Sequence, residues 1–208
     1  MTTIVLATRN AHKAQEMRAM LGAAWIVRTL EDFPNAPSVV EDAATFEGNA
    51  AKKARTLAQW LCQQNDAGNA AAVLADDSGL EVDFLQGAPG VHSARFASAG
   101  PENSPDAANN AKLLRLLETV PPDQRTARFR CVLALAPDIR GGEIEFFAGA
   151  CEGRIARERA GQGGFGYDPL FVPEGQTRSF AELGEDVKNR ISHRAQAMAR
   201  LKRRLAVG

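Results

Sequence analysis

The hydrophobic and polar positions of the chain alternate between short apolar runs and longer stretches with helical spacing. The apolar run at residues 3–8 predicts a buried strand, and residues 9–21 then repeat apolar side chains at the spacing of one helix face. Residues 49–61 repeat this helical pattern, and residues 71–77 form another apolar run typical of a buried strand. Strands that alternate with helices in this way predict an α/β fold.

Further elements are predicted between and beyond these segments. The turn-rich stretch after residue 29 is expected to carry an edge strand around Val39 and Val40, and polar residues 63–70 are expected to form a loop. A Pro/Gly/Ser-rich loop is predicted at residues 97–106, followed by a helix that stops at Pro121 and Pro122, which cannot continue it.

The last third of the chain is predicted to add more strands. Residues 127–136 alternate apolar and polar side chains, the pattern of a half-buried antiparallel strand with Cys131 facing inward. Residues 142–156 are interpreted as a pair of strands. A glycine-rich loop at 161–169 then leads to a short strand and to a closing helix from about Ser192 to Leu205. No linker separates independent domains, so residues 1–208 are expected to form a single domain.

Composition narrows the class of protein. The 208 residues carry 25 Lys and Arg against 25 Asp and Glu, a formal net charge of zero, which argues against nucleic acid as the main partner. Cys62, Cys131 and Cys151 are odd in number and form no CxxC pair, which favours reduced thiols over a disulfide framework or a zinc site. The apolar runs are too short to span a bilayer. We therefore expect a cytoplasmic protein with no membrane partner.

Residues 7–13, ATRNAHK, are the first group of candidate functional residues. They lie where a strand gives way to a helix, so backbone N–H groups together with Thr8, Asn10 and Lys13 can cradle an anion. The alternative is that Asn10 only caps the helix and that Lys13 is solvated. The GxxxxGK pattern of a P-loop is not present in the sequence.

Two acidic groups accompany this cradle. Asp76 and Asp77 follow an apolar run, and because strand side chains alternate between faces, a bend at Ser78 and Gly79 is expected to let one carboxylate enter a cleft. Mg²⁺ prefers one or two carboxylates beside substrate phosphates, and an Asp-rich turn without metal is the alternative. Earlier in the chain, Glu41 precedes a helix.

Asn49 and Lys53 lie four residues apart on that helix and therefore share one face. Their face adjoins the apolar stripe that is predicted to pack inward. A Lys beside a packed face usually extends to water, and Glu41 is equally suited to be a surface residue.

Two further groups lie late in the chain. In GGFGYDPLF, residues 163–171, an aromatic side chain between glycines can stack on a flat ring, although Phe165 and Tyr167 are equally suited to anchor the loop in the core. Lys188, His193 and Arg194 gather cationic donors near the start of the last helix, with Ser192 as its expected N-cap. A phosphate cradle, an acid pair, a stacking loop and these donors together indicate a nucleotide polyphosphate.

The chain resembles the inosine/xanthosine triphosphate pyrophosphatase family, whose members hydrolyse deaminated purine nucleoside triphosphates. The resemblance rests on seven segments, in this order over nearly the whole chain: ATRNAHK, TFEGNAAKKA, ADDSGLEVD, GAPGVHSARF, RFRCVLAL, GQGGFGYDPLFVP and KNRISHRAQAM. It implies a mixed α/β fold with an elongated, twisted central sheet flanked by helices, and two lobes with an active-site cleft between them. It also implies a homodimer and Mg²⁺-dependent release of pyrophosphate.

The resemblance also implies a role for each matched residue. Asp77 and Lys53 are the implied catalytic residues, and Glu41, Asp77 and Asp76 are the implied metal ligands. The implied substrate-binding residues are Thr8, Arg9, Asn10, Ala11, His12, Lys13, Asn49, Ser78, Phe165, Gly166, Tyr167, Asp168, Lys188, His193 and Arg194. The sequence departs from the family pattern at Arg9, where Gly is common, and in a longer loop at residues 62–70.

The predicted activity is hydrolysis of ITP, dITP and XTP by attack of water on the α-phosphorus. Donors from Arg194, His193 or the Phe165 loop would select a 6-keto oxygen over the amino group of adenine. One alternative is a pyrophosphatase of similar fold that acts on modified pyrimidine nucleotides. A second is a nucleotide-binding regulator without turnover, and a third is a nucleic-acid binder that uses the basic residues 200–205.

Overall fold

The structure is a computed structural model that describes residues 2–64 and 72–206. Its strands are β1 (Thr2–Leu6), β2 (Trp25–Thr29), β3 (Ala72–Val82), β4 (Thr126–Ala136), β5 (Glu145–Ile155) and β6 (Phe171–Pro173). Its helices are α1 (Ala11–Leu21), α2 (Phe46–Gln63), α3 (Asp106–Leu116), α4 (Phe180–Leu183), α5 (Glu185–Ile191) and α6 (His193–Ala206), with 3-10 turns η1 (Asp83–Leu85), η2 (Gly90–Arg95) and η3 (Pro122–Gln124).

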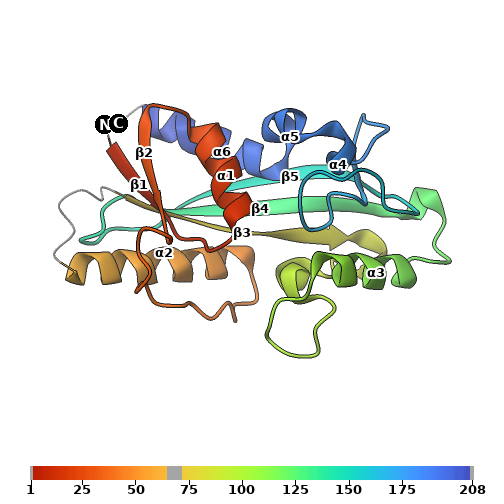
Figure 1. The fold of residues 1–208 in the computed structure, drawn as a ribbon, viewed down its shortest axis with the longest axis horizontal. Helices are drawn as coiled ribbons and strands as arrows, with labels where there is room; N and C mark the ends of the chain where they lie inside the picture. The colour runs from red at the N-terminus through yellow and green to blue at the C-terminus, as the bar shows by residue number, and fades with distance from the viewer. Residues whose placement is uncertain (1, 65–71, 207–208) are drawn as a thin grey trace. The chain divides into compact units, whose positions relative to one another are not determined.

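The strands form one mixed sheet in the order β2-β1-β3-β4-β5-β6 (Figure 1). β1 pairs in parallel with both β2 and β3, whereas β5 and β6 are antiparallel. Parallel neighbours need crossover connections, and α1 and α2 supply them here. The prediction of a mixed α/β fold is therefore confirmed.

The chain divides into two compact units, and the boundary falls within β3, β4, β5 and α6. Unit 1 comprises residues 1–77, 131–148 and 197–208, and unit 2 comprises residues 78–130 and 149–196. In unit 1, α1 and α6 cover one face of the strands and α2 covers the other (Figure 1). Met17 of α1 and Met198 of α6 pack on Ile4 and Leu74, so this face holds an apolar core.

Unit 2 has a core of its own. Leu80 of β3 and Leu113 of α3 belong to it, together with an aromatic group formed by Phe129, Phe171 and Phe180. The Phe129 and Phe171 ring centroids lie 4.7 Å apart, and those of Phe171 and Phe180 lie 5.5 Å apart. Offset aromatic contacts of this kind add to the stabilisation from burial.

Most predicted elements are present, although α3 ends at Leu116, before the predicted stop at Pro121. Three further predictions are wrong. Val39 and Val40 form no strand, because the edge of the sheet beside β1 is occupied by β2, and Val40 is 68% exposed. Residues 145–155 form one strand, not two. A side chain at Gly153 would collide with the Val172 carbonyl of β6, so this glycine permits close strand packing and does not mark a turn.

The third error concerns the bend expected after Asp77, since β3 runs unbroken from Ala72 to Val82. The predicted loop at 63–70 lies mostly outside the described residues, which resume at residue 72. Within the part of the chain that the structure describes, no helix is long and apolar enough to cross a membrane.

Candidate active site

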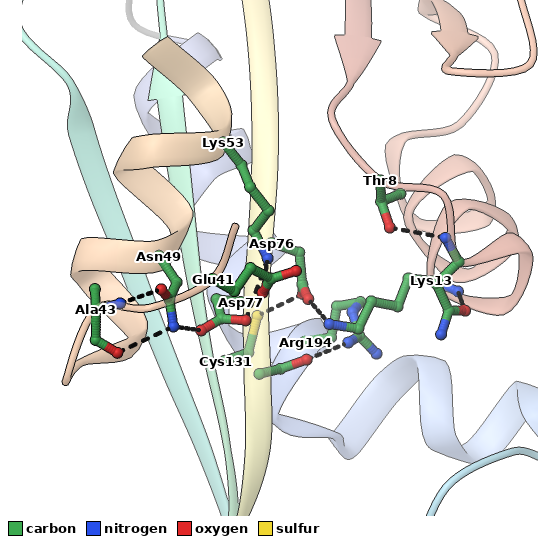
Figure 2. A network of polar contacts seen from close by, with 12 residues as sticks. Thr8, Lys13, Glu41, Ala43, Asn49, Lys53, Asp76, Asp77, Cys131 and Arg194 are labelled. Atoms are coloured by element: carbon green, nitrogen blue, oxygen red, sulfur yellow. Dashed lines mark hydrogen bonds and ion pairs between the residues drawn. The ribbon is translucent and has the colours of Figure 1, made fainter. Parts of the chain in front are cut away.

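Asp76 and Asp77 lie in the middle of β3, and their side chains leave it on opposite faces. Asp76 is two residues from Leu74 and therefore lies on the same face of β3, the face that packs under α1 and α6. Asp77, one residue further, lies on the opposite face. Each carboxylate accordingly has its own set of partners (Figure 2). The alternation of an unbroken strand therefore separates the acid pair into two environments.

Asp76 is paired with Lys13 at the start of α1. The Lys13 ammonium lies 2.6 Å from Asp76 Oδ1, and the Cys131 thiol of β4 donates to Asp76 Oδ2 at 3.1 Å. Asn10 caps α1, because its side-chain oxygen accepts from the Lys13 N–H. Lys13 therefore lies at the helix N-terminus, where its ammonium pairs with a fully buried carboxylate and is not simply solvated.

Asp77 belongs to a second cluster on the α2 side of β3. The Lys53 ammonium lies 2.7 Å from Glu41 and 3.2 Å from Asp77, and the Glu41 and Asp77 side chains also interact directly. The side chain of Lys53 is 12% exposed and that of Glu41 is 39% exposed. Lys53 therefore does not extend to water, and the cluster opens to solvent on the Glu41 side.

Asn49 holds this cluster together from the first turns of α2. Its side-chain oxygen accepts from the Ala43 N–H at 2.9 Å, and its amide nitrogen donates to Asp77 Oδ2 at 3.2 Å. The residue is buried, so the side chain fixes both the segment after Glu41 and the Asp77 carboxylate. Thr45 caps α2 by accepting from the Gly48 N–H, which sets where the helix begins.

Burial and charge shift the protonation equilibria of this cluster. Burial raises the pKa of Asp77 to about 6, against the opposing effect of Lys53 and Lys13. The pKa of Glu41 is lowered, because the attraction of Lys53 outweighs its partial burial. The pKa of Lys53 is raised, since Asp77 and Glu41 outweigh the cost of desolvation. Lys53 is thus held as a cation between a carboxylate and an acid that titrates near neutrality.

The remaining residues of the first predicted group lie around the N-terminus of α1. Thr8 accepts from the Asn10 N–H at 3.1 Å, while Ala11 and His12 are exposed in the first turn. Arg9 donates to the Ala36 carbonyl at 2.8 Å and so ties this turn to the segment after β2. The backbone at 8–13 therefore presents the N-terminal end of a helix beside Lys13.

A separate group of predicted residues lies in unit 2, around the glycine-rich loop. Asp168 accepts from the Phe165 N–H and pairs with Lys188 at 2.5 Å, and Lys188 also lies 4.3 Å from the Phe165 ring centroid. Gly164 has φ +72°, and a side chain there would collide with Asp168. The loop is thus closed tightly on its own carboxylate.

Phe165 and Tyr167 have different environments within this loop. Tyr167 is buried in the core of unit 2 and donates its hydroxyl to the Ser93 carbonyl at 2.9 Å. Phe165 remains partly exposed. Tyr167 is therefore the anchor of the loop, and Phe165 is the aromatic side chain that it presents.

His193 and Arg194, at the start of α6, are buried in unit 2. Arg194 donates to the Ser78 hydroxyl at 2.8 Å, next in the chain to Asp77, and its guanidinium lies 6.0 Å from the Phe165 ring centroid. His193 stacks on Phe129 with ring centroids 4.8 Å apart and an interplanar angle of 13°. Ser192 caps α6 by accepting from the Ala195 N–H, as predicted.

Sequence reasoning missed two residues that support the loop. Asp106 accepts from the Gly166 N–H at 2.6 Å, and Asn110 donates to the Gly166 carbonyl at 2.8 Å. Both come from α3. Asn110 is fully buried on the face that also carries Leu113, and a polar residue on an apolar helix face was the available signal.

Comparison of the sequence with known proteins shows the family to which the chain belongs. The sequence profile of the Ham1 family matches residues 4–204. The chain belongs to the Ham1 family. It is 50% identical over 196 residues to a protein of Desulforamulus reducens named dITP/XTP pyrophosphatase, covering 94% of this chain and 91% of that one.

Solved structures agree with this assignment. The chain is similar to a HAM1 protein from Coxiella burnetii, with a TM-score of 0.85, 38% identity and full coverage of both chains. It is also similar to a protein from Mycobacterium abscessus described as a nucleoside-triphosphatase / dITP/XTP pyrophosphatase, with a TM-score of 0.72, 40% identity and coverage of 96% and 98%. The resemblance drawn from the sequence motifs is therefore confirmed.

Proposed function

We propose that this Ham1-family chain hydrolyses ITP, dITP and XTP to the nucleoside monophosphate and pyrophosphate. The observation that carries the proposal is the Glu41–Lys53–Asp77 cluster, in which two carboxylates share one buried ammonium. Relatives that align over nearly the whole chain are named dITP/XTP pyrophosphatases, which supports the substrate class. The enzyme is accordingly a nucleoside triphosphate pyrophosphatase.

Asp77 is the residue that we assign as general base. In the proposed step, a water oxygen forms a bond to the α-phosphorus, the bond from that phosphorus to the bridging oxygen breaks, and Asp77 takes the water proton. A base works best when its pKa is near the working pH, and burial raises the pKa of Asp77 to about 6. The Asn49 amide on Oδ2 orients the carboxylate for this role.

Lys53 and Lys13 are the cations that we assign to the phosphates. The ammonium of Lys53 lies 3.2 Å from Asp77, so it is placed to offset charge that develops at the reacting phosphorus. Lys13 and the backbone of residues 8–13 lie at a helix N-terminus, an arrangement that favours bound phosphate. Asp76 then acts as a positioning residue that holds Lys13.

Glu41 and Asp77 fit a magnesium ion. Among the described residues, no group of three or more His, Cys, Asp or Glu side chains is arranged to hold a metal ion by itself. Mg²⁺ is commonly held by one or two carboxylates together with substrate phosphates and water, which matches a two-carboxylate cluster that is open on the Glu41 side. When bound, the ion would neutralise phosphate charge. Asp76 is left out of this set, because it lies on the other face of β3.

The unit 2 residues are the ones that we assign to the nucleoside. Phe165 offers a partly exposed ring, and the buried cations Lys188 and Arg194 lie 4.3 Å and 6.0 Å from its centroid. Such N–H groups would donate to a 6-keto oxygen, and adenine, which has an amino group there, would leave them unpaired. The loss reaches about 10⁴-fold in discriminating sites. His193, stacked on Phe129, and Asn49, bound to Asp77, are assigned positioning roles in place of direct contact.

We also propose that the enzyme is a cytoplasmic homodimer. The three cysteines are free thiols, which suits a reducing compartment. Phe84 is 51% exposed, and covering such apolar side chains would favour self-association. Light scattering coupled to size exclusion gives the oligomeric state directly, and a monomeric mass at all concentrations would contradict this part of the proposal.

A nucleotide panel tests the proposed activity. ITP, dITP, XTP, ATP, GTP and modified pyrimidine nucleotides are each incubated with and without Mg²⁺, and released pyrophosphate is separated from orthophosphate. We expect pyrophosphate from the deaminated purine nucleotides only, and only with the metal. Preference for a pyrimidine nucleotide would support the similar-fold alternative, and binding without turnover would support a regulator.

A further inference from the structure

A second charged site lies in unit 2, in a cavity of about 460 Å³. Its lining residues are Leu114, Arg115, Glu118, Arg125 and Arg157. None of them belongs to the residues assigned above to nucleotide binding or catalysis. The volume falls within the range of about 300–1,000 Å³ that is typical of small-molecule sites.

Arg125 is the unusual member of this cavity. The residue is 2% exposed, and its Nε atom has no hydrogen-bond partner among the described residues. A buried charged group without a partner is costly, so such a position usually marks a missing counter-charge. Within the part of the chain that the structure describes, none of the three arginines forms an ion pair.

The backbone explains why two of the arginines meet. Arg125 is the residue after the η3 turn, and its carbonyl accepts from the N–H of Ile155, the last residue of β5, at 2.9 Å. Arg157 follows two residues later. Its charge and the burial of Arg125 together lower the pKa of the Arg125 guanidinium, burial being the larger cause. Two positive charges are thus held close together by a main-chain hydrogen bond.

We propose that this cavity binds a small anion that carries phosphate groups. Guanidinium groups match phosphate oxygens through paired N–H donors, and three of them against one carboxylate, that of Glu118, leave an excess of two positive charges. Bound phosphate oxygens would supply the missing acceptor for Arg125 Nε and would screen Arg125 from Arg157.

Helix α3 connects the cavity to the glycine-rich loop. Leu114 and Arg115 lie near the C-terminal end of α3, and Asp106 and Asn110, which bind Gly166, lie towards its N-terminal end. The same helix therefore carries both the wall of the cavity and the support of the loop. The proposal itself concerns binding and does not depend on the proposed function.

The test is an NMR titration of the metal-free protein in EDTA with inorganic phosphate and, separately, with pyrophosphate. We expect saturable shifts of the Arg125 Nε–Hε resonance. Arg157→Gln should weaken this binding at least 10-fold, and Glu118→Gln should tighten it several-fold, because a repelling carboxylate is removed.

Arg159→Gln is the matched control, since Arg159 is exposed, lies two residues from Arg157 and does not line the cavity. It should leave the affinity unchanged. Equal weakening by Arg157→Gln and Arg159→Gln, or no saturable shift at Arg125, would overturn the proposal. Because the readout is a resonance of Arg125 without metal or nucleotide, failure here is independent of whether the enzyme releases pyrophosphate.

Discussion

The neighbouring carboxylates Asp76 and Asp77 lie on opposite faces of β3 and have different partners. On the α1 side, Asp76 has its own ammonium from Lys13 at 2.6 Å and a thiol donor from Cys131. On the α2 side, Asp77 shares one ammonium with a second carboxylate, Glu41. One acid is matched by a dedicated counter-charge, and the other is held where its protonation is sensitive to its surroundings. The pleat of a strand is therefore sufficient to give two adjacent carboxylates different partners.

Of the substitutions considered, replacement of Asp77 should lower the turnover of ITP most. Asp77→Asn keeps the shape and the contact with Asn49 but removes the base, so kcat for ITP should fall about 10³-fold. Asp76→Asn is the matched control one residue away, and it should cost about 10-fold, since only the placement of Lys13 is affected. Pyrophosphate release under saturating Mg²⁺ measures both, and a larger loss for Asp76→Asn would reverse the comparison.

Replacing Lys53 should have the next largest effect. Lys53→Met removes the cation beside the reacting group, and kcat should fall about 10²-fold. Because Lys53 opposes the effect of burial on Asp77, its loss should also move the pKa of Asp77 above about 6. A carboxyl ¹³C titration of the metal-free protein follows this shift. A lower Asp77 pKa in the variant would contradict the assignment.

Stability should depend on pH through Asp77. Its folded-state pKa of about 6 is above the value of 3.8 for an unperturbed Asp, so between these values the folded state binds more protons than the unfolded state. The free energy of unfolding of the metal-free protein should therefore fall as pH rises from about 4 to about 6, by roughly 2–3 kcal/mol. Urea unfolding at several pH values measures this. Asp77→Asn should abolish this part of the pH dependence, and an unchanged slope would contradict it.

Replacement of Cys131, whose thiol donates to Asp76, should have the smallest effect on stability and activity. Cys131→Ala removes the donor to Asp76 Oδ2, and the free energy of unfolding should fall by about 1 kcal/mol. Cys131→Ser restores a hydroxyl donor at the same position and should lose less. Because Lys13 remains paired, both variants should retain most of the activity. A severe loss of turnover in Cys131→Ala alone would mean that the α1 side takes part in the chemistry.

Much of this arrangement could be predicted from the sequence. Local patterns were sufficient for α1 and α2, and the order of the motifs identified the family. The course of β3 was not predictable in this way. Asp-Asp-Ser-Gly has poor strand propensity, and the strand continues because both its faces are covered and its acids find partners from distant elements.

Non-local contacts explain the other errors and omissions. Val39 and Val40 have strand propensity, but pairing beside β1 is decided by β2. The cavity around Arg125 depends on the hydrogen bond that its carbonyl accepts from the N–H of Ile155, thirty positions away at the end of β5. Nothing in the local sequence distinguishes this arginine from exposed ones.

The position of the bond that water forms is the most direct test of the account. Hydrolysis of ITP in H₂¹⁸O, followed by mass spectrometry of both products, shows which phosphorus is attacked. If the Asp77 face of β3 directs water to the α-phosphorus, one ¹⁸O atom will appear in the nucleoside monophosphate and none in the pyrophosphate. Label in the pyrophosphate, or release of orthophosphate in its place, would contradict the account.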